Sequence, residues 1–273
     1  MGMANFNKNL FVGTGGVDGI NLSHFIGAVH GMEKMMGRQS NPLRDILNYC
    51  SEKYLQDALD LWYILTVVAP NAQGEIVLRG LYIGRDIACY QAACDLSLQV
   101  NFTILDKPIR RCVAYMEEAE YHGLWVGNKA IYRTRMAMAD GGNLIILAPG
   151  VRRFGDDPQA DTLIRRYGYK GTEATMKAMK ENPELQQSLS AVAHLLHGST
   201  DGRFTITYCP GHVSREDIEG VGFQYGDLAT YSQRYDVTKL KDGWNTDEEG
   251  EFFFISKPAL GLWTVKDRLG DDE

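Results

Sequence analysis

The second half of the sequence alternates short apolar runs with segments of helical periodicity. Four runs are predicted to be strands: Cys112–Met116, Leu144–Ala148, Phe204–Tyr208 and Phe252–Ile255, the last closing the fold. Helices are expected near Asn128–Ala139, between Asp157 and His197, and after Ser214. Strands separated by helices pair mainly in parallel, in sheets covered on both faces. The pattern therefore predicts an α/β fold with a mainly parallel sheet covered by helices.

The first part of the chain has a different pattern, which restarts near residue 106. We therefore expect two units, 1–106 and 107–273, each of α/β type. The first unit is expected to begin with a strand at Asn9–Gly13, a turn at Gly13–Gly16 and a helix capped by Ser23. A helix opened by Pro42 should follow. The unit should end with a hairpin of Leu61–Val68 with Glu75–Ile83 and a helix from Asp86 to Val100. The acidic end, Gly270–Glu273, is expected to fray.

Composition excludes several classes of function. The formal net charge of −7 argues against a nucleic-acid partner, which requires clustered Lys and Arg. The longest apolar stretch, Leu59–Pro70, is interrupted by Asp60 and is shorter than the roughly 20 residues that span a membrane. No secretory signal is recognisable, and the five cysteines are scattered without a Cys-x-x-Cys pair. These features predict a cytoplasmic protein with reduced thiols and no membrane partner.

Four short motifs have more than one interpretation. The turn Gly13–Gly16 is a phosphate cradle or a plain tight turn, with even weight on each. His194 and His197 lie on one helical face and could bind a metal, although a helix end facing a polar cleft is favoured. Cys209 and His212 could combine a thiol with an imidazole, but a strand-ending turn is favoured. Asp140–Gly142 is interpreted as a helix-to-strand joint without chemistry.

Longer segments are more specific. Gly2–Gly13, Ser23–Phe25, Gly127–Met136 and Ala139–Gly150, in this order, resemble the nickel-dependent lactate racemase family. The likeness is greatest to its D-mannonate epimerase-like members, which share segments similar to Ala193–Ser199, Arg203–His212 and Lys241–Thr246. The resemblance spans nearly the whole chain and corresponds to the C-terminal portion of such proteins.

The resemblance implies a cofactor and three site residues. In that family a nickel-pincer nucleotide is tethered to a lysine and takes hydride from C2 of a 2-hydroxy acid, then returns it to either face. Lys8 matches the tethering lysine, His24 the histidine that binds nickel, and Lys129 the lysine that reaches the substrate. Residues 1–106 would be the rear part of the cofactor-binding domain, and 107–273 a complete substrate-side domain. The expected function is racemisation or epimerisation at C2 of a small 2-hydroxy acid, such as the aldonate D-mannonate.

The resemblance also implies something that the sequence lacks. Family members have an upstream segment with two histidines that act as general acid and base, and none of the six histidines here matches them. A complementing N-terminal polypeptide is therefore an expected partner. Two alternatives stay open. The first is a non-catalytic binding or accessory protein, or one half of a split enzyme. The second is a different reaction on the same scaffold.

Overall fold

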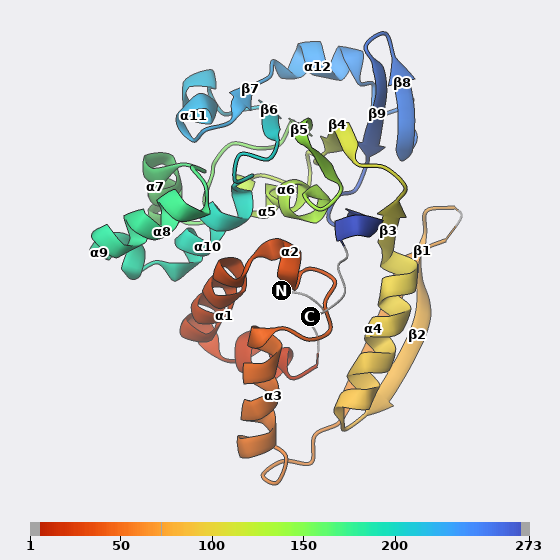
Figure 1. Cartoon of the computed structure of the whole chain (residues 1–273), viewed down its shortest axis with the longest axis vertical. Helices are drawn as coiled ribbons and strands as arrows, with labels where there is room; N and C mark the ends of the chain where they lie inside the picture. The colour runs from red at the N-terminus through yellow and green to blue at the C-terminus, as the bar shows by residue number, and fades with distance from the viewer. Residues whose placement is uncertain (1–5, 72, 269–273) are drawn as a thin grey trace. The chain divides into compact units, whose positions relative to one another are not determined.

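Figure 1 shows the computed structural model, which describes residues 6–71 and 73–268. The chain divides after Phe102 into two compact units, a few residues before the predicted boundary. The predicted frayed end at 270–273 lies outside the described residues. In the described ranges, no helix is both long and apolar enough to cross a bilayer.

The first unit contains a helical part and a ribbon of two strands. Its elements are η1 (Asn9–Gly13), α1 (Gly16–His30), α2 (Met32–Met35), α3 (Pro42–Tyr54), β1 (Tyr63–Pro70), β2 (Ile76–Gly84) and α4 (Ile87–Asn101). The predicted hairpin is confirmed, because β1 and β2 pair antiparallel. Two predicted helix starts are also confirmed. At the start of α3, before Pro42, the Asn41 side chain accepts a hydrogen bond from the Arg44 N–H. At the start of α4, the Asp86 side chain accepts one from the Cys89 N–H.

Two predictions for the beginning of this unit are wrong. Asn9–Gly13 is a turn of π-helix, not a strand, and Ser23 lies inside α1 instead of capping it. The reason is close packing of α1 on η1. A Cβ atom on Gly15 would lie 2.0 Å from the Phe11 carbonyl oxygen, and one on Gly19 would lie 2.8 Å from the same atom. The glycines let the two helical segments meet, so the chain turns back at once instead of continuing as a strand.

The second unit is built on a six-stranded sheet in the order β7-β6-β5-β4-β9-β8. All neighbouring strands are parallel except β8 and β9. The strands of this unit are β3 (Phe102–Leu105), which begins at the division, β4 (Ile109–Tyr115), β5 (Met138–Ala148), β6 (Thr205–Pro210), β7 (Gln224–Tyr225), β8 (Gly243–Asp247), β9 (Gly250–Ile255) and β10 (Leu262–Val265). The predicted mainly parallel α/β fold is confirmed.

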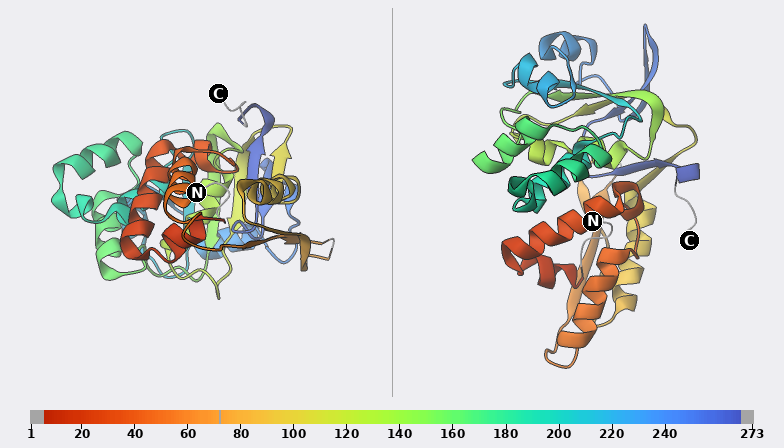
Figure 2. Two further views of the ribbon diagram at one scale, coloured as in Figure 1. Left: turned by 90° about the horizontal axis from the view of Figure 1, so that it is seen from below. Right: turned by 60° about the vertical axis from the view of Figure 1, so that its left-hand side comes forward.

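Helices lie on both faces of this sheet (Figure 2). They are α5 (Leu124–Gly127), α6 (Lys129–Thr134), α7 (Pro158–Tyr167), α8 (Thr172–Glu181), α9 (Pro183–Gln186), α10 (Leu189–Gly198), α11 (Arg215–Gly220), α12 (Leu228–Arg234) and the short η2 (Lys266–Arg268). Val113, Ile145 and Leu147 belong to a core cluster that includes side chains of α12. Their neighbours Ala114 and Ile146 are also fully buried and point the other way, because successive side chains of a strand alternate between faces.

Three predictions for the second unit need correction. The helix expected at Asn128–Ala139 ends at Thr134, and β5 already begins at Met138. Asp140–Gly142 is therefore part of β5 and not a joint between a helix and a strand. The pairing of β4 with β5 is irregular there, and Gly141 has a φ of +73°, which glycine adopts without strain. Finally, β9 does not close the fold, because β10 follows it and pairs with β3.

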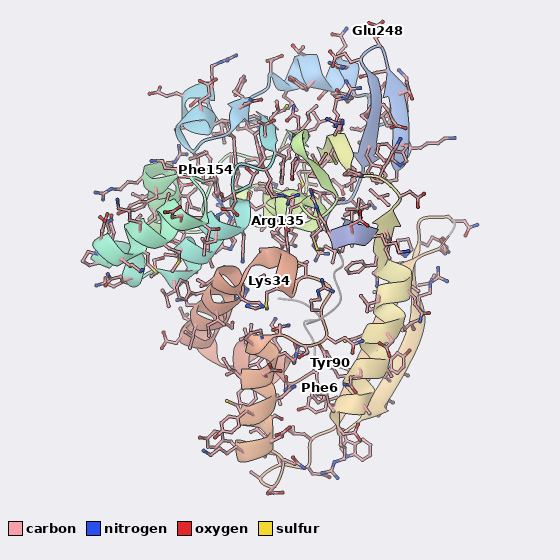
Figure 3. All side chains as sticks on the ribbon, in the orientation of Figure 1. Phe6, Lys34, Tyr90, Arg135, Phe154 and Glu248 are labelled. Atoms are coloured by element: carbon pink, nitrogen blue, oxygen red, sulfur yellow. The ribbon has the colours of Figure 1, made fainter. Side chains whose placement is uncertain are left out.

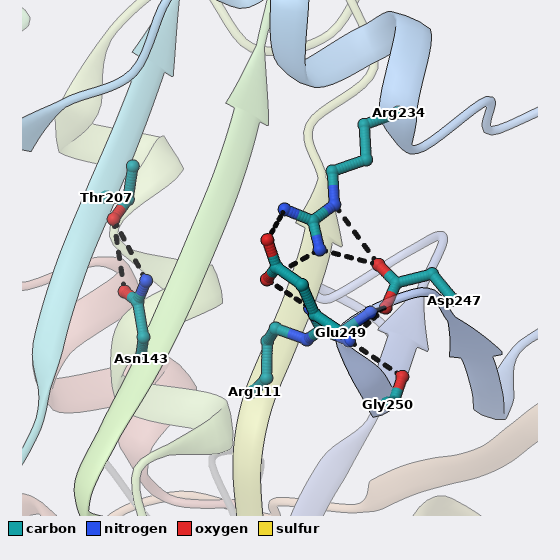
Figure 4. A network of polar contacts seen from close by, with 7 residues as sticks. All are labelled: Arg111, Asn143, Thr207, Arg234, Asp247, Glu249 and Gly250. Atoms are coloured by element: carbon teal, nitrogen blue, oxygen red, sulfur yellow. Dashed lines mark hydrogen bonds and ion pairs between the residues drawn. The ribbon is translucent and has the colours of Figure 1, made fainter.

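Two arginines tie the antiparallel edge of the sheet to α12 (Figure 4). Arg111 on β4 contacts Asp247 at 2.5 Å and donates to the Gly250 carbonyl at 2.7 Å, and Arg234 contacts the same Asp247 at 2.8 Å. Burial by itself raises the pKa of Asp247, but hydrogen bonds from Arg234 and Arg111 outweigh it and leave the pKa below its ordinary value. The ionised carboxylate therefore stabilises the folded state.

We expect Arg111→Met to lower the free energy of unfolding by about 2 kcal/mol at pH 7, because it removes a partner of a carboxylate that is mostly buried. A carboxyl whose pKa is depressed stabilises the fold above its unfolded pKa, and this contribution is lost as the pH falls through the folded pKa. The effect of the substitution should therefore shrink toward pH 3 in urea titrations.

Lys107→Met provides the control, because Lys107 forms an exposed ion pair with Glu251. It should cost less than about 1 kcal/mol. Equal losses for the two variants at pH 7 would contradict a stabilising role for the Arg111 and Asp247 pair.

Candidate functional site

The backbone is strained two residues before Lys8. Phe6 has a φ of +71°, a conformation that non-glycine residues rarely adopt. Its ring lies 4.1 Å from the Tyr63 ring and 5.5 Å from the Tyr90 ring, between centroids, and is buried. Figure 3 labels Phe6 and Tyr90 in this contact. The aromatic packing holds the strained residue, and such strain gathers at functional sites.

The next residue, Asn7, belongs to a buried polar network. Asn7 is completely buried; its Oδ1 accepts a hydrogen bond from Arg44 at 2.6 Å and its Nδ2 donates to Asn48 Oδ1 at 2.8 Å. The guanidinium of Arg44 also lies 4.5 Å from the centre of the Tyr90 ring. Neither Asn7 nor Arg44 was predicted as a site residue. Helical periodicity treats Arg44 as a surface position of α3, and only contacts distant in sequence bury it.

Lys8 stands between this network and the π-helical turn η1. Burial lowers the pKa of Lys8, and the nearby Arg44 guanidinium lowers it further. A lysine with a lowered pKa has more of the neutral, nucleophilic amine at neutral pH. Turns of π-helix are rare and are frequent at functional sites. The strained Phe6 and the buried polar network thus lie next to Lys8, the residue with a lowered pKa that the sequence predicts as the tether.

His24 lies on α1, close enough to Lys8 for the two to interact electrostatically. Burial lowers the pKa of His24, the hydrogen bond to the Ile20 carbonyl opposes this, and the Lys8 ammonium lowers the pKa again. The ring nitrogen Nδ1 is 2.7 Å from the Ile20 oxygen. Since a carbonyl can only accept, Nδ1 carries the proton and Nε2 keeps its lone pair. A neutral imidazole with its second nitrogen held by a carbonyl is the usual form of a metal-binding histidine.

No group of three or more His, Cys, Asp or Glu side chains that could hold a metal occurs in the part of the chain that the structure describes. His24 could therefore supply one ligand to a metal whose other ligands belong to an organic group. The donor chemistry of Lys8 and His24 fits the lysine-tethered nickel cofactor that the resemblance implies. Both assignments stay predictions.

A pocket of about 440 Å³ lies beside this region in the first unit. Phe6, Asn7 and Asn48 form part of its wall, and its charged lining residues are Glu52, Asp57, Arg85 and Asp86. Arg85 is paired with Asp60 at 2.7 Å. Because carboxylates outnumber cations, the pocket disfavours a phosphate. The glycine turn before α1 has a packing role, described above, and its alternative role as a phosphate cradle stays a prediction.

Lys129 belongs to the second unit, where it opens α6 and is half-buried. The preceding residue, Asn128, is 1% exposed. Its Nδ2 donates to the Tyr169 hydroxyl at 3.4 Å. The position of Asn128, and with it the start of α6, is therefore held by groups on other elements.

His194 is the centre of this buried polar cluster. Its ring stacks on Trp125 with centroids 4.5 Å apart and an interplanar angle of 3°. Nε2 donates to the Leu124 carbonyl at 3.3 Å, so Nδ1 accepts from the Tyr169 hydroxyl at 3.2 Å. Burial lowers the pKa of His194 to about 4, although the Leu124 and Trp125 carbonyls oppose the shift. His194 is thus a neutral core histidine that holds the Tyr169 hydroxyl, which in turn accepts from Asn128.

His197, one turn further along α10, is half-buried, and its ring centroid is 5.8 Å from that of Tyr132. Tyr132 lies three residues after Lys129 and so on the same side of α6. Tyr132 thus contacts His197 and shares a side of α6 with Lys129, a link that the sequence did not make.

Cys209 and His212 do not form a catalytic pair. The thiol is buried in the core against α12, and burial, with Asp227, raises its pKa to about 12. His212 is exposed. A Cβ atom on the intervening Gly211 would lie 1.8 Å from the Pro149 carbonyl oxygen. The favoured interpretation, a strand-ending turn, accounts for this segment.

The sequence matches no protein-family model and no curated protein. Eight chains of known structure match the fold. One is a protein from Thermotoga maritima solved by a structural genomics consortium, with 24% identity and a TM-score of 0.72 over 90% of this chain. Another is the lactate racemase apoprotein from Thermoanaerobacterium thermosaccharolyticum, with 12% identity and a TM-score of 0.62 over 89% of this chain. The fold is therefore lactate racemase-like.

Both matched chains are longer. This chain covers 59% of the Thermotoga protein and 55% of the lactate racemase.

The buried His194 predicts a specific pH dependence of stability. Its pKa is about 4 in the folded state, against an ordinary histidine value of 6.5. A histidine with a depressed pKa stabilises the fold above its unfolded pKa, and this contribution is lost as the pH falls from 6.5 toward 4. The loss should be about 3 kcal/mol over this interval.

In urea titrations, His194→Gln should be less stable than the parent at pH 7, and the difference should narrow steadily below pH 6.5. His122→Gln, at an exposed histidine, should be about as stable as the parent at pH 7. If the difference in the free energy of unfolding between the parent and His194→Gln does not change with pH, His194 is not a neutral buried imidazole.

Proposed function

We propose that this chain contributes to an isomerase that racemises or epimerises a 2-hydroxy acid at C2. The observation that carries the proposal is the pairing of Lys8 with His24, since a perturbed amine and a neutral imidazole interact beside a strained, buried polar network. They do so in a fold that resembles a lactate racemase apoprotein.

The proposed cofactor is a nickel-pincer nucleotide. Lys8 would hold it through its side-chain nitrogen, whose pKa burial lowers. His24 would offer Nε2 to the nickel ion, with the ring orientation held by the bond from Nδ1 to Ile20. When bound, this group supplies the acceptor for the hydride that leaves C2 of the substrate.

The proposed role of Lys129 is to bind the substrate. An ammonium complements the carboxylate of a 2-hydroxy acid and the negative charge that develops on its oxygen atoms. Tyr132 and His197 would add hydrogen-bonding groups. Such a group suits a polyhydroxylated acid, and we propose an aldonate such as D-mannonate.

We further propose that a complementing N-terminal polypeptide supplies the groups that move the proton of the 2-hydroxyl. One fact supports this: the buried, low-pKa His194 does not have the environment of a general base poised near neutral pH.

The cofactor proposal is tested by intact mass and peptide mapping of the protein. For this test it is co-expressed with pincer-synthesising enzymes and with the part of the Thermotoga protein that this chain does not match. A nucleotide-sized adduct is expected on the peptide containing Lys8. It should be absent from Lys8→Ala and retained in Lys53→Ala, because Lys53 is an exposed lysine on α3. An adduct that persists in Lys8→Ala would show that Lys8 is not the tether.

The substrate proposal is tested by chiral chromatography of 2-hydroxy acids incubated with the loaded, completed protein. Lys129→Met should reduce kcat/KM by about 10- to 100-fold, because one charge-assisted contact with the substrate is lost. Lys170→Met, at an exposed lysine of the same unit, should leave turnover unchanged. If both variants match the parent, Lys129 does not contact the substrate.

A further inference from the structure

The helix α6 carries two cationic side chains on one face. Lys129 is three residues from Tyr132 and four from Arg133, and helical geometry places Lys129 between the other two in projection. All three residues are half-buried. The residues on the opposite face of α6 are completely buried: Ala130, Ile131 and Thr134. Lys129, Tyr132 and Arg133 therefore form the polar face of an amphipathic helix, and we call them the α6 face.

Other elements of the second unit border the α6 face. His197 on α10 lies beside Tyr132, with ring centroids 5.8 Å apart. The segment that leads into β10 lies beside Arg133, whose Nη1 donates to the Gly261 carbonyl oxygen at 3.0 Å. Because one nitrogen of the guanidinium is already bonded to the backbone, the orientation of the group is fixed before any ligand binds.

The positive charge of the α6 face is not balanced by a carboxylate in the described part of the chain. No ion pair there involves Lys129 or Arg133, and the buried Arg133 Nε atom has no hydrogen-bond partner. Burial, together with Glu120 and Glu117, raises the pKa of the nearby Tyr121 to about 12, and the Arg133 charge opposes this shift. A guanidinium that is partly removed from water and unpaired costs free energy, which a bound anion would offset.

We propose that Arg133 binds the carboxylate of the substrate and leaves Lys129 to contact the oxygen at C2. This inference rests on the proposed function. A guanidinium presents its nitrogen atoms in a planar fork that matches a carboxylate, whereas an ammonium is a compact charge that suits a developing negative charge on one oxygen. Side chains four residues apart on a helix have Cβ atoms roughly 6 Å apart, so the two cations can contact adjacent groups of one small acid.

Equilibrium binding to the purified chain tests this assignment without turnover. Isothermal titration calorimetry would compare D-mannonate with D-mannonamide, in which a neutral amide replaces the carboxylate. The parent should bind D-mannonate about 10- to 100-fold more tightly, because charge-assisted hydrogen bonds form only with the carboxylate. Arg133→Met should lower this preference to about threefold or less, and Arg133→Lys should keep part of it, because the charge stays and the fork is lost.

Arg110→Met is the matched control, since Arg110 is an exposed arginine on β4. This variant should keep the preference of the parent for D-mannonate. Circular dichroism should show that all variants are folded.

Two results would overturn the proposal. The first is an Arg133→Met variant that keeps the preference of the parent. The second is a parent chain that binds both compounds alike or neither, as expected if a carboxylate of another polypeptide pairs with Arg133. If the preference depends on Arg133 but the completed protein turns over no 2-hydroxy acid, the carboxylate site stands and the proposed reaction is wrong.

Steady-state kinetics of the loaded, completed protein separate the role of Arg133 from that of Lys129. The carboxylate keeps its charge throughout the reaction, so Arg133→Met should raise KM by about 10-fold or more and leave kcat within about threefold. Lys129→Met should lower kcat, because negative charge develops on the oxygen that Lys129 contacts. A lower kcat with an unchanged KM for Arg133→Met would contradict carboxylate binding by Arg133.

Discussion

The second unit depends on one constraint: both faces of its central strands must be covered. Ile145 points toward α12 and Ile146 toward the opposite face, and both are buried. Parallel strands cannot be joined by a tight turn, so the chain has to cross over between β4 and β5. The segments α5 and α6 lie in that crossover, and Lys129 begins α6. The position of the candidate substrate lysine thus follows from how a parallel sheet is connected.

In the first unit, the environment of Lys8 is determined by packing at some distance along the chain. Phe6 keeps a positive φ because Tyr63 and Tyr90 enclose its ring. Asn7 is held by Arg44 and Asn48 from α3. These contacts bury part of Lys8 and bring a guanidinium near its amine, and both effects favour the neutral amine. Rigid support of this kind is what a covalent attachment site requires.

The two units differ in how fully they cover their apolar surface. Central strands of the second unit are buried on both faces, whereas β1 alternates between buried and exposed residues along its length. The alternation is typical of a strand with one covered face. Here, however, two of the four exposed positions, Ile64 and Val68, carry large aliphatic side chains.

Local patterns in the sequence were sufficient for the α/β class, the β1 and β2 hairpin, and the helices opened by Pro42 and Asp86, because strand alternation, turn residues and caps act within a few positions. They were insufficient for the π-helical turn at Asn9–Gly13, the early start of β5 and the late strand β10, which depend on contacts between distant segments. For the candidate site, the sequence by itself selected Lys8, His24 and Lys129 through resemblance. Only the tertiary structure decided that Arg44 is buried beside Lys8, that His24 presents Nε2, and that His194 is a neutral core residue. Burial and hydrogen-bond partners set the protonation of such groups, and both come from residues far apart in the chain.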